Sequence, residues 1–177
     1  MPISLPCKLA IPESDLVTNG TSLLSDPSSP QAAASCNVLF LHTVDTESLT
    51  GPQAIRKALG VTLALRPGPI ALLVHFKVTP QGITLTDKQH KLFFRRHYPQ
   101  ANISHCGLDP DNRQWAFHDP ETGASTSGRC FGFVARKPGS RTDNQCHLFV
   151  ELDPSQPASA IVSFIAKTSL FLRSTPL

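Results

Sequence analysis

Residues 72–87, with the sequence LLVHFKVTPQGITLTD, decide the fold. Apolar residues occupy every second position from Leu72 to Val78, with His75 and Lys77 between them, which is the period of a strand with one buried face. Proline, glutamine and glycine at 80–82 then supply a turn, and Ile83 and Leu85 resume the alternation. The stretch therefore predicts a β-hairpin.

Five further segments are rich in strand-forming residues and separated by turn signals. They are residues 37–45, 91–98, 102–108, 129–137 and 145–153. The stretch 109–128 is polar apart from Trp115, Ala116 and Phe117, and is predicted to be a long loop or an irregular hairpin. Seven strands at this spacing predict an antiparallel β-sandwich or a partly open barrel.

Two segments have helical patterns. Residues 50–60 carry Thr50 as a possible cap, Pro52 in the first turn and Gly60 as a stop, which predicts a short helix between the first two strands. A second helix is predicted from Asp153-Pro154 onwards, because apolar residues recur at spacings of three and four. Its apolar stripe must be buried, so it would cover an open end of the sheet system in an α+β fold.

The first 36 residues have a different composition. Residues 16–36 are rich in Ser, Ala and Pro with few large apolar residues, and are predicted to be a linker. Before them, Leu5, Cys7, Leu9 and Ile11 alternate as in a strand, but this segment has no sheet of its own to join.

Length and composition indicate one complete, soluble domain. The chain has 177 residues, 40% of them hydrophobic and 16% charged, and its net charge of +3 is too small to indicate nucleic-acid binding. No apolar run is long enough to span a bilayer, and the start of the chain lacks the pattern of a signal peptide, so we expect a cytoplasmic protein. The five cysteines form an odd set without a CxxC pair, which favours reduced thiols.

The sequence offers no enzymatic, metal-binding or cofactor-binding motif. Cys106 beside His105, and Cys146 beside His147, suggest a thiol-imidazole pair, but neighbouring strand residues point to opposite faces. The spacing of cysteines and histidines does not fit zinc, and no P-loop, GxSxG or GxGxxG fingerprint is present. We therefore expect no catalysis and no cofactor.

Three long stretches carry a family resemblance. They are NVLFLHTVDTESLTGPQAIRKAL (37–59), VHFKVTPQGITLTDKQHKLFFRRHYP (74–99) and FGFVARKPGSRTDNQCHLFVELDPSQPASAIVSF (131–164). They resemble the C-terminal phosphotyrosine-binding (PTB) domain of tensins, whose shorter C-terminal tensin-like member we favour. The resemblance implies a PTB domain of the pleckstrin-homology-like superfold over residues 37–174. It departs from the family at 109–128.

The start of the chain carries a second resemblance. LPCKLAIPES is similar to the last strand of the Src homology 2 domain that precedes the PTB domain in tensins. This similarity implies that residues 1–15 are a remnant of that domain. The phosphate-binding arginine of such a domain is not among them, so no phosphotyrosine binding is assigned to the remnant.

By the same resemblance, a peptide would add as an antiparallel strand to one sheet edge beside the C-terminal helix. The implied edge residues are Ile103, Ser104, His105, Cys106, Gly107 and Leu108, with Gly107 allowing another backbone to approach. The implied helix wall is Ile161, Phe164, Ile165 and Thr168. For all four, plain core packing is the alternative, and it is favoured for Ile161 and Ile165.

Two basic sets are candidates for anionic ligands. Arg95, Arg96 and Arg136, with Arg129 and Lys137, could pair with a phosphotyrosine, although a solvated strand face is the favoured interpretation. Arg56, Lys57 and Lys91, with Lys88 and His90, resemble the region where related domains meet phosphoinositides.

The resemblance also implies partners and location. We expect a monomeric adaptor that docks NPxY-type tails, such as those of β-integrins, at focal adhesions and cell junctions, and links them to the actin cytoskeleton. The alternative is a phosphoinositide or membrane-surface module of the same superfold.

Overall fold

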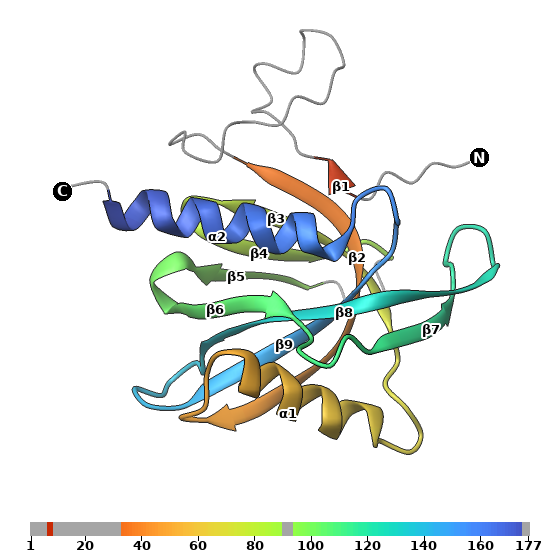
Figure 1. Cartoon of the computed structure of the whole chain (residues 1–177), viewed down its shortest axis with the longest axis horizontal. Coiled ribbons are helices and arrows are strands. Elements are labelled where there is room, and N and C mark those ends of the chain that lie inside the picture. The colour runs from red at the N-terminus through yellow and green to blue at the C-terminus, as the bar shows by residue number, and fades with distance from the viewer. Residues whose placement is uncertain (1–6, 9–32, 90–93, 175–177) are drawn as a thin grey trace, which may run out of the picture.

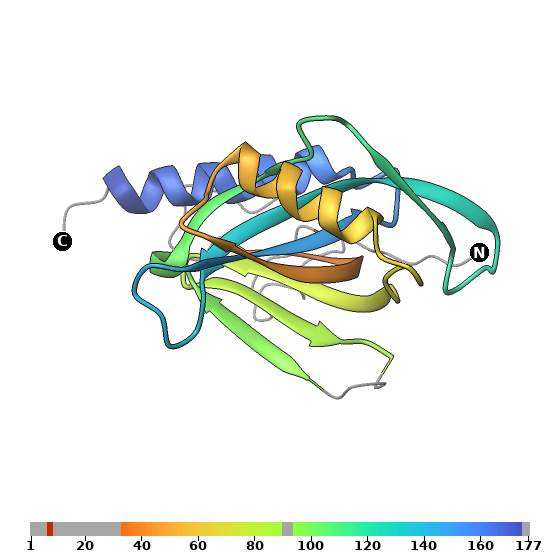
Figure 2. The same ribbon diagram turned by 90° about the horizontal axis from the view of Figure 1, so that it is seen from below.

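The computed structural model describes residues 7–8, 33–89 and 94–174. The strands form one strongly bent antiparallel sheet, with α2 (Ala158–Ser174) lying across one side and α1 (Pro52–Leu63) on the other (Figures 1 and 2). The sheet is built from β1 (Cys7–Lys8), β2 (Ala34–Glu47), β3 (Leu72–Thr79), β4 (Gly82–Asp87), β5 (Arg95–Pro99), β6 (Ile103–Leu108), β7 (Gln114–His118), β8 (Ser125–Arg136) and β9 (Asn144–Glu151). The α+β sandwich fold with a C-terminal helix is therefore confirmed.

The strand order is β5-β4-β3-β2-β9-β8-β6, with β1 paired to β2 and β7 paired to β8. The predicted hairpin is β3–β4, with Phe76 opposite Leu85 and Val78 opposite Ile83. A short 3-10 helix, η2 (Gln100–Asn102), connects β5 to β6. The two ends of the strand order are thus consecutive in sequence.

Two apolar clusters lie on the two sides of the sheet. On the α2 side, four fully buried phenylalanines pack edge to face or stacked, and Phe76 and Phe149 have ring centroids 5.1 Å apart. On the α1 side, Ile55 and Leu59 pack with Leu148 and Val150 of β9. Each helix is therefore held by its own apolar cluster.

Several predicted boundaries are wrong. The helix α1 does not stop at Gly60, because Thr62 continues it and its hydroxyl donates to the Ala58 carbonyl at 2.8 Å. Thr50 is not the cap, since Gly51 holds that position without a side-chain hydrogen bond. The C-terminal helix begins at Ala158 rather than at Asp153-Pro154.

Other differences concern the strands. The stretch 109–128 contains β7, which pairs with β8 from Gln114 opposite Arg129 to His118 opposite Ser125, so the hairpin alternative is confirmed, although no strand was predicted there. The strand β2, which was predicted to begin at residue 37, begins at Ala34, inside the predicted linker. The strand predicted for 91–98 begins at Arg95, and its first part lies outside the described residues. Of the alternating segment Leu5 to Ile11, only β1 is described, and it does join the sheet.

Candidate functional site

The strand β6 lies at one end of the strand order and pairs through one edge only, with β8. Among the described residues, no strand pairs with its other edge. The helix α2 runs alongside it (Figure 1). The backbone N–H and C=O groups on the outer edge of β6 are therefore available to an added strand, next to a wall formed by the helix.

Side chains of β6 alternate between the two sides of the sheet. Cys106 and Leu108 are half-buried against the α2-side cluster, opposite Phe133 and Phe131 of β8. His105 lies opposite Val134, which belongs to the α1-side cluster. A register shift between residues 103 and 105 returns Ile103 to the α2 side. The α2 side of the edge is thus apolar and partly open.

The four predicted wall residues of α2 are all buried. Ile161 is 8% exposed, Phe164 5%, Ile165 3% and Thr168 1%, and the Thr168 hydroxyl donates to the Phe164 carbonyl at 2.9 Å. Their burial gives all four a packing role, including Phe164 and Thr168, which the resemblance had placed in contact with a peptide.

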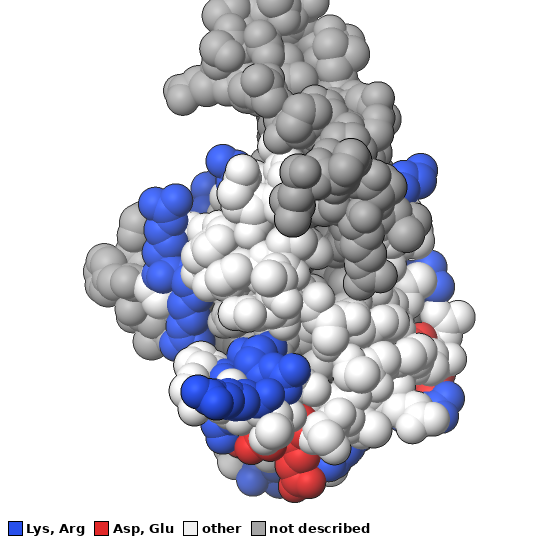
Figure 3. Space-filling view, turned by 90° about the vertical axis from the view of Figure 1, so that its left-hand side faces the viewer, with Lys and Arg blue, Asp and Glu red and all other residues white. Residues whose placement is uncertain are grey.

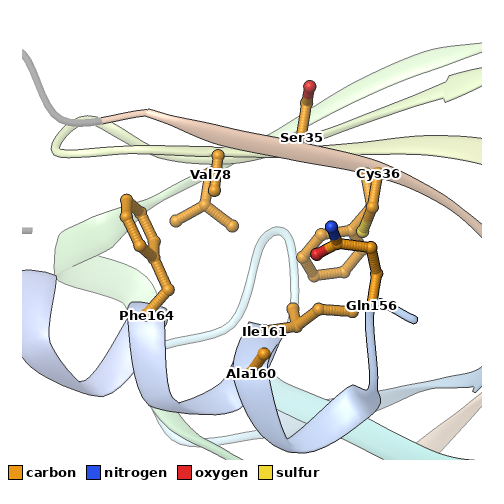
Figure 4. Close-up of a pocket in the computed structure, with 9 residues that line it drawn as sticks. Ser35, Cys36, Val78, Gln156, Ala160, Ile161 and Phe164 are labelled. Atoms are coloured by element: carbon orange, nitrogen blue, oxygen red, sulfur yellow. The ribbon is translucent and has the colours of Figure 1, made fainter. Parts of the chain in front are cut away.

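Val162 was not among the predicted wall residues. It is half-buried and packs on the same cluster as Cys106 and Leu108. At 100° per residue, Val162 and Phe164 lie on opposite flanks of the buried stripe of α2. Phe164 packs towards the start of β2 and the end of β3, where it lines a hollow (Figure 4). Val162 is therefore the better candidate for the groove wall beside β6.

Gly107 leaves room for a neighbouring side chain. A Cβ atom at this position would lie 2.8 Å from Nε2 of His105 and 3.6 Å from Cδ1 of Ile55. The absence of a side chain thus makes room for the His105 ring over the strand. Close approach of a peptide backbone at Gly107 stays a prediction.

Both ends of β6 are fixed by polar contacts. At its start, the hydroxyls of Ser104 and Thr50 are 2.6 Å apart. Just after its end, Asp109 is 4% exposed and accepts hydrogen bonds from the backbone N–H groups of Asp111 and Arg113 and from the Arg113 guanidinium, with Nε at 2.8 Å. These contacts hold the two ends of the edge strand in place.

The Asp109 carboxyl is charged despite its burial. Burial alone would raise its pKa, but the hydrogen bonds from Arg113 and from the backbone outweigh that effect, and the pKa is lowered. The Arg113 guanidinium also donates to the Arg56 carbonyl, which connects this loop to α1.

Residues 35–173 match the model of the phosphotyrosine-binding domain family. The chain belongs to the PTB domain family. Membership indicates a protein-interaction module of the adaptor type rather than a catalytic domain. The solution structure of the C-terminal phosphotyrosine interaction domain of mouse APBB2 shares the fold, with a TM-score of 0.52 over 85% of this chain and 96% of that one at 17% identity.

The chain is also similar to tensins. It is 53% identical to Tensin-1 of Gallus gallus and 51% identical to Tensin-2 of Mus musculus, each over 96% of its length, and 44% identical to Tensin-4 of Bos taurus over 93%. It spans 10%, 12% and 23% of those proteins. The resemblance to tensins is confirmed. Identity is lowest to Tensin-4, the shortest of the three, so the shorter family member gains no support.

The arginines of this PTB domain do not converge on β6. Arg95 and Arg96 point to opposite faces of β5, and the Arg96 guanidinium lies 5.1 Å from the centre of the Phe94 ring. Arg129 donates to the Asn112 side chain, and Lys137 pairs with Asp45 at 2.8 Å. Arg136 is exposed and follows Ala135, the partner of Ile103. Figure 3 shows the cations of one face in separate groups with uncharged surface between them.

The described members of the candidate lipid set are exposed. Arg56 is 3.2 Å from the Asp111 carboxylate, which partly neutralises it, while Lys57 and Lys88 are exposed. Lys91 and His90 lie outside the described residues.

The cysteines and histidines of the PTB domain are buried or separated. Burial raises the pKa of the Cys146 thiol to about 12 and lowers that of the His147 imidazole to about 4, and it also raises the pKa of Cys106. His105 and Cys106 point to opposite sides of the sheet. Within the described ranges, no three His, Cys, Asp or Glu side chains are grouped as a metal site would need, and no helix is long and apolar enough to cross a membrane.

Proposed function

We propose that this PTB domain is a non-catalytic adaptor that docks extended NPxY-type peptide tails by strand addition at β6. The observation that carries the proposal is the unpaired outer edge of β6 beside α2. Main-chain hydrogen bonds to that edge would supply affinity, and side-chain contacts would supply specificity.

The side-chain geometry supports a defined peptide pattern. In an added antiparallel strand, every second side chain points to the α2 side. Those side chains would meet Cys106 and Leu108 of β6, and Val162 of α2 is half-buried against the same apolar cluster. The intervening side chains would face His105 on the other side. We therefore expect apolar residues at alternating peptide positions before the NPxY turn.

The identity of the tail is inferred from the similarity to tensins. We propose that the partners are β-integrin-like receptor tails, that the protein acts in the cytoplasm at focal adhesions and cell junctions, and that its longer relatives link such tails to the actin cytoskeleton.

A peptide titration tests the proposal. A β-integrin tail peptide with an intact NPxY motif is added to the 15N-labelled chain, and amide shifts are followed. We expect saturable changes from Ile103 to Leu108 and at Val162, and a control peptide with the NPxY residues replaced by alanine should produce much smaller ones. Absence of changes along β6 would overturn the proposal.

A vesicle titration of the same labelled sample distinguishes the phosphoinositide alternative from peptide docking. Vesicles of phosphatidylcholine with and without phosphatidylinositol bisphosphate are added in place of the peptide. Changes confined to Arg56 and Lys57, with none along β6 in either titration, would favour a lipid-surface module instead.

A further inference from the structure

The edge of β2 has a section that β9 does not cover. Pairing between β2 and β9 ends with Val38 opposite Glu151, after which the chain leaves the sheet towards α2. From Ala34 to Asn37, β2 is paired on its other side with β3. The strand β1 lies in the position that β9 vacates, with Cys7 opposite Cys36 and Lys8 opposite Ser35 (Figure 1).

An apolar hollow opens beside this section of β2. It lies between the start of β2, the end of β3 and the first turns of α2, and its lining includes Ala34, Cys36, Val78, Ala160, Ile161 and Phe164. Figure 4 shows Cys36 pointing into the hollow and Ser35 pointing away from it. The lining is apolar apart from Ser35 and Gln156, and unfilled apolar surface of this kind forfeits packing contacts.

The size of the hollow restricts its occupant. Its volume is about 20 Å³. One water needs about 10 to 15 Å³ by this measure, so the hollow has room for the end of one side chain rather than for a ligand of drug size. The small side chain of Ala34 contributes to this space.

We propose that the hollow is the seat of this chain's own N-terminal segment, residues 5–11, which adds to β2 as a strand and inserts Leu9. The described pairing fixes the register, because continuing it by one residue sets Leu9 opposite Ala34. Directly opposed residues of an antiparallel pair share one face of the sheet, and Ala34 lines the hollow. The alternation of Leu5, Cys7, Leu9 and Ile11 is the pattern that one buried strand face requires.

This inference is independent of the function proposed for β6. It concerns a different strand edge and the other flank of α2, the one that carries Ala160 and Phe164 rather than Val162. The surface would therefore be an intramolecular docking site that joins the N-terminal segment to the PTB domain.

Disulfide trapping in the full 177-residue chain tests the register. Directly opposed residues have Cα atoms about 4.5 to 5.5 Å apart, which a disulfide can bridge. Diamide takes two electrons and two protons from the Cys7 and Cys36 thiols, so that both S–H bonds break, one S–S bond forms and the N=N bond of diamide is reduced to a hydrazine. We expect an intramolecular Cys7–Cys36 disulfide in most molecules, identified by peptide mapping under non-reducing conditions.

Two matched variants make the trapping specific. The double variant Cys36→Ser/Ser35→Cys shifts the β2 thiol by one residue to the opposite face, and its yield with Cys7 should be at least fivefold lower. Moving both thiols, in Cys7→Ser/Cys36→Ser/Lys8→Cys/Ser35→Cys, should restore the yield. Equal yields from all three pairs would overturn the pairing, and a disulfide between two chains would assign the surface to a second copy.

A methyl-labelled sample tests the insertion of Leu9. Ala34 and Ala160 both line the hollow, so their 13Cβ methyl signals should shift in Leu9→Ala. They should stay unchanged in Leu16→Ala, which removes the same atoms outside the alternating segment. If Leu9→Ala leaves both signals in place, another occupant fills the hollow and the proposal fails.

Discussion

The strands β5 and β6 end the same sheet in opposite ways. Arg95, Arg96 and Pro99 place charge and proline on β5, and His97 is exposed as well. The strand β6 has the sequence ISHCGL, which contains no Lys, Arg, Asp, Glu or proline, and α2 runs alongside it. Charged residues and proline are common protections of an edge strand, whereas an uncharged edge invites another strand.

The difference teaches which edge is built for addition. Around β6, the structure supplies an apolar wall from α2, a hydroxyl contact at Ser104 and a buried ion pair just after Leu108. Around β5, the described residues supply mainly exposed side chains. An edge strand that such contacts hold at both ends loses less conformational entropy when a peptide pairs with it than a loosely held strand would.

The largest expected effect concerns the helix that backs β6. Phe164→Ala removes a side chain that is 5% exposed, and should lower the free energy of unfolding by about 3 to 5 kcal/mol. Because Phe164 lies on the flank away from β6, the folded fraction should keep its peptide affinity within about threefold, or about 0.7 kcal/mol. Urea unfolding and a peptide titration of the same sample measure both.

Ser163→Ala, at an exposed position one residue away, is the control and should change stability by less than about 0.5 kcal/mol. A tenfold loss of peptide affinity in folded Phe164→Ala would return this residue to the groove wall.

The next effect concerns the anchor at the end of β6. Asp109→Ala leaves the hydrogen bonds of Arg113 without their acceptor and should cost about 2 to 3 kcal/mol, somewhat less than for a fully buried pair, because Arg113 is partly exposed. The matched variant Asp111→Ala removes a carboxylate that is 45% exposed and should cost less than about 1 kcal/mol. Similar losses in the two variants would contradict the anchoring role.

The same anchor predicts a pH dependence. The pKa of Asp109 is lowered in the folded state, so the unfolded chain binds its proton at higher pH. The stabilisation is therefore complete above the unfolded pKa of about 3.9 and is lost as the pH falls through the folded value. In urea unfolding, the stability gap between the wild-type chain and Asp109→Asn should shrink below about pH 4. A gap that stays constant down to pH 2 would mean that another group carries the effect.

The fourth prediction tests the groove wall directly. Val162→Glu introduces a charge at the apolar cluster on which Cys106 and Leu108 also pack, and should weaken binding of the NPxY peptide at least tenfold, about 1.4 kcal/mol. The fold should survive, since Val162 is half-buried. Ser163→Glu adds the same charge to the same turn on the exposed side and should change the affinity less than twofold. Fluorescence anisotropy with a labelled peptide distinguishes the two, and wild-type affinity in Val162→Glu would exclude this flank of α2.

The sequence predicts elements best where burial alternates. The strand β3 was predicted with the boundaries that it has, because its apolar and polar residues alternate from Leu72 to Val78. The strand β7 was not, although Trp115 and Phe117 alternate with exposed neighbours, because its partner is the far end of the long strand β8. The helix α1 passes through Gly60 because that residue is exposed and nothing nearby forces an end.

The site was predicted less completely than the fold. The period of α2 identifies the stripe of Ile161 and Ile165 but does not tell which flank of it faces β6, so the prediction named Phe164 and not Val162 as a wall residue. Peptide binding to Phe164→Ala and Val162→Glu decides between the two. The edge position of β6 followed from the family resemblance, because no local pattern reveals which strand lacks a second neighbour. Strand order is a property of long-range pairing, and only coordinates reveal it here.

The smallest expected effect is that of phosphorylating the peptide tyrosine, which tests whether the cations of β5 reach a peptide docked on β6. Arg95 and Arg96 lie at the start of β5, about 10 Å along the strand from its end, and Arg96 turns back over Phe94. Arg136 is exposed and follows Ala135, the partner of Ile103, where the C-terminal part of an antiparallel peptide would end. One exposed arginine adds little binding free energy to a solvated phosphate, so phosphorylation of the peptide tyrosine should raise the affinity less than tenfold, about 1.4 kcal/mol.

The gain is measured by titrating the phosphorylated and the unphosphorylated peptide into the wild-type chain, Arg136→Ala and Arg95→Ala/Arg96→Ala. Only Arg136→Ala should reduce it. A larger gain that disappears in Arg95→Ala/Arg96→Ala would show that the two edges act on one ligand.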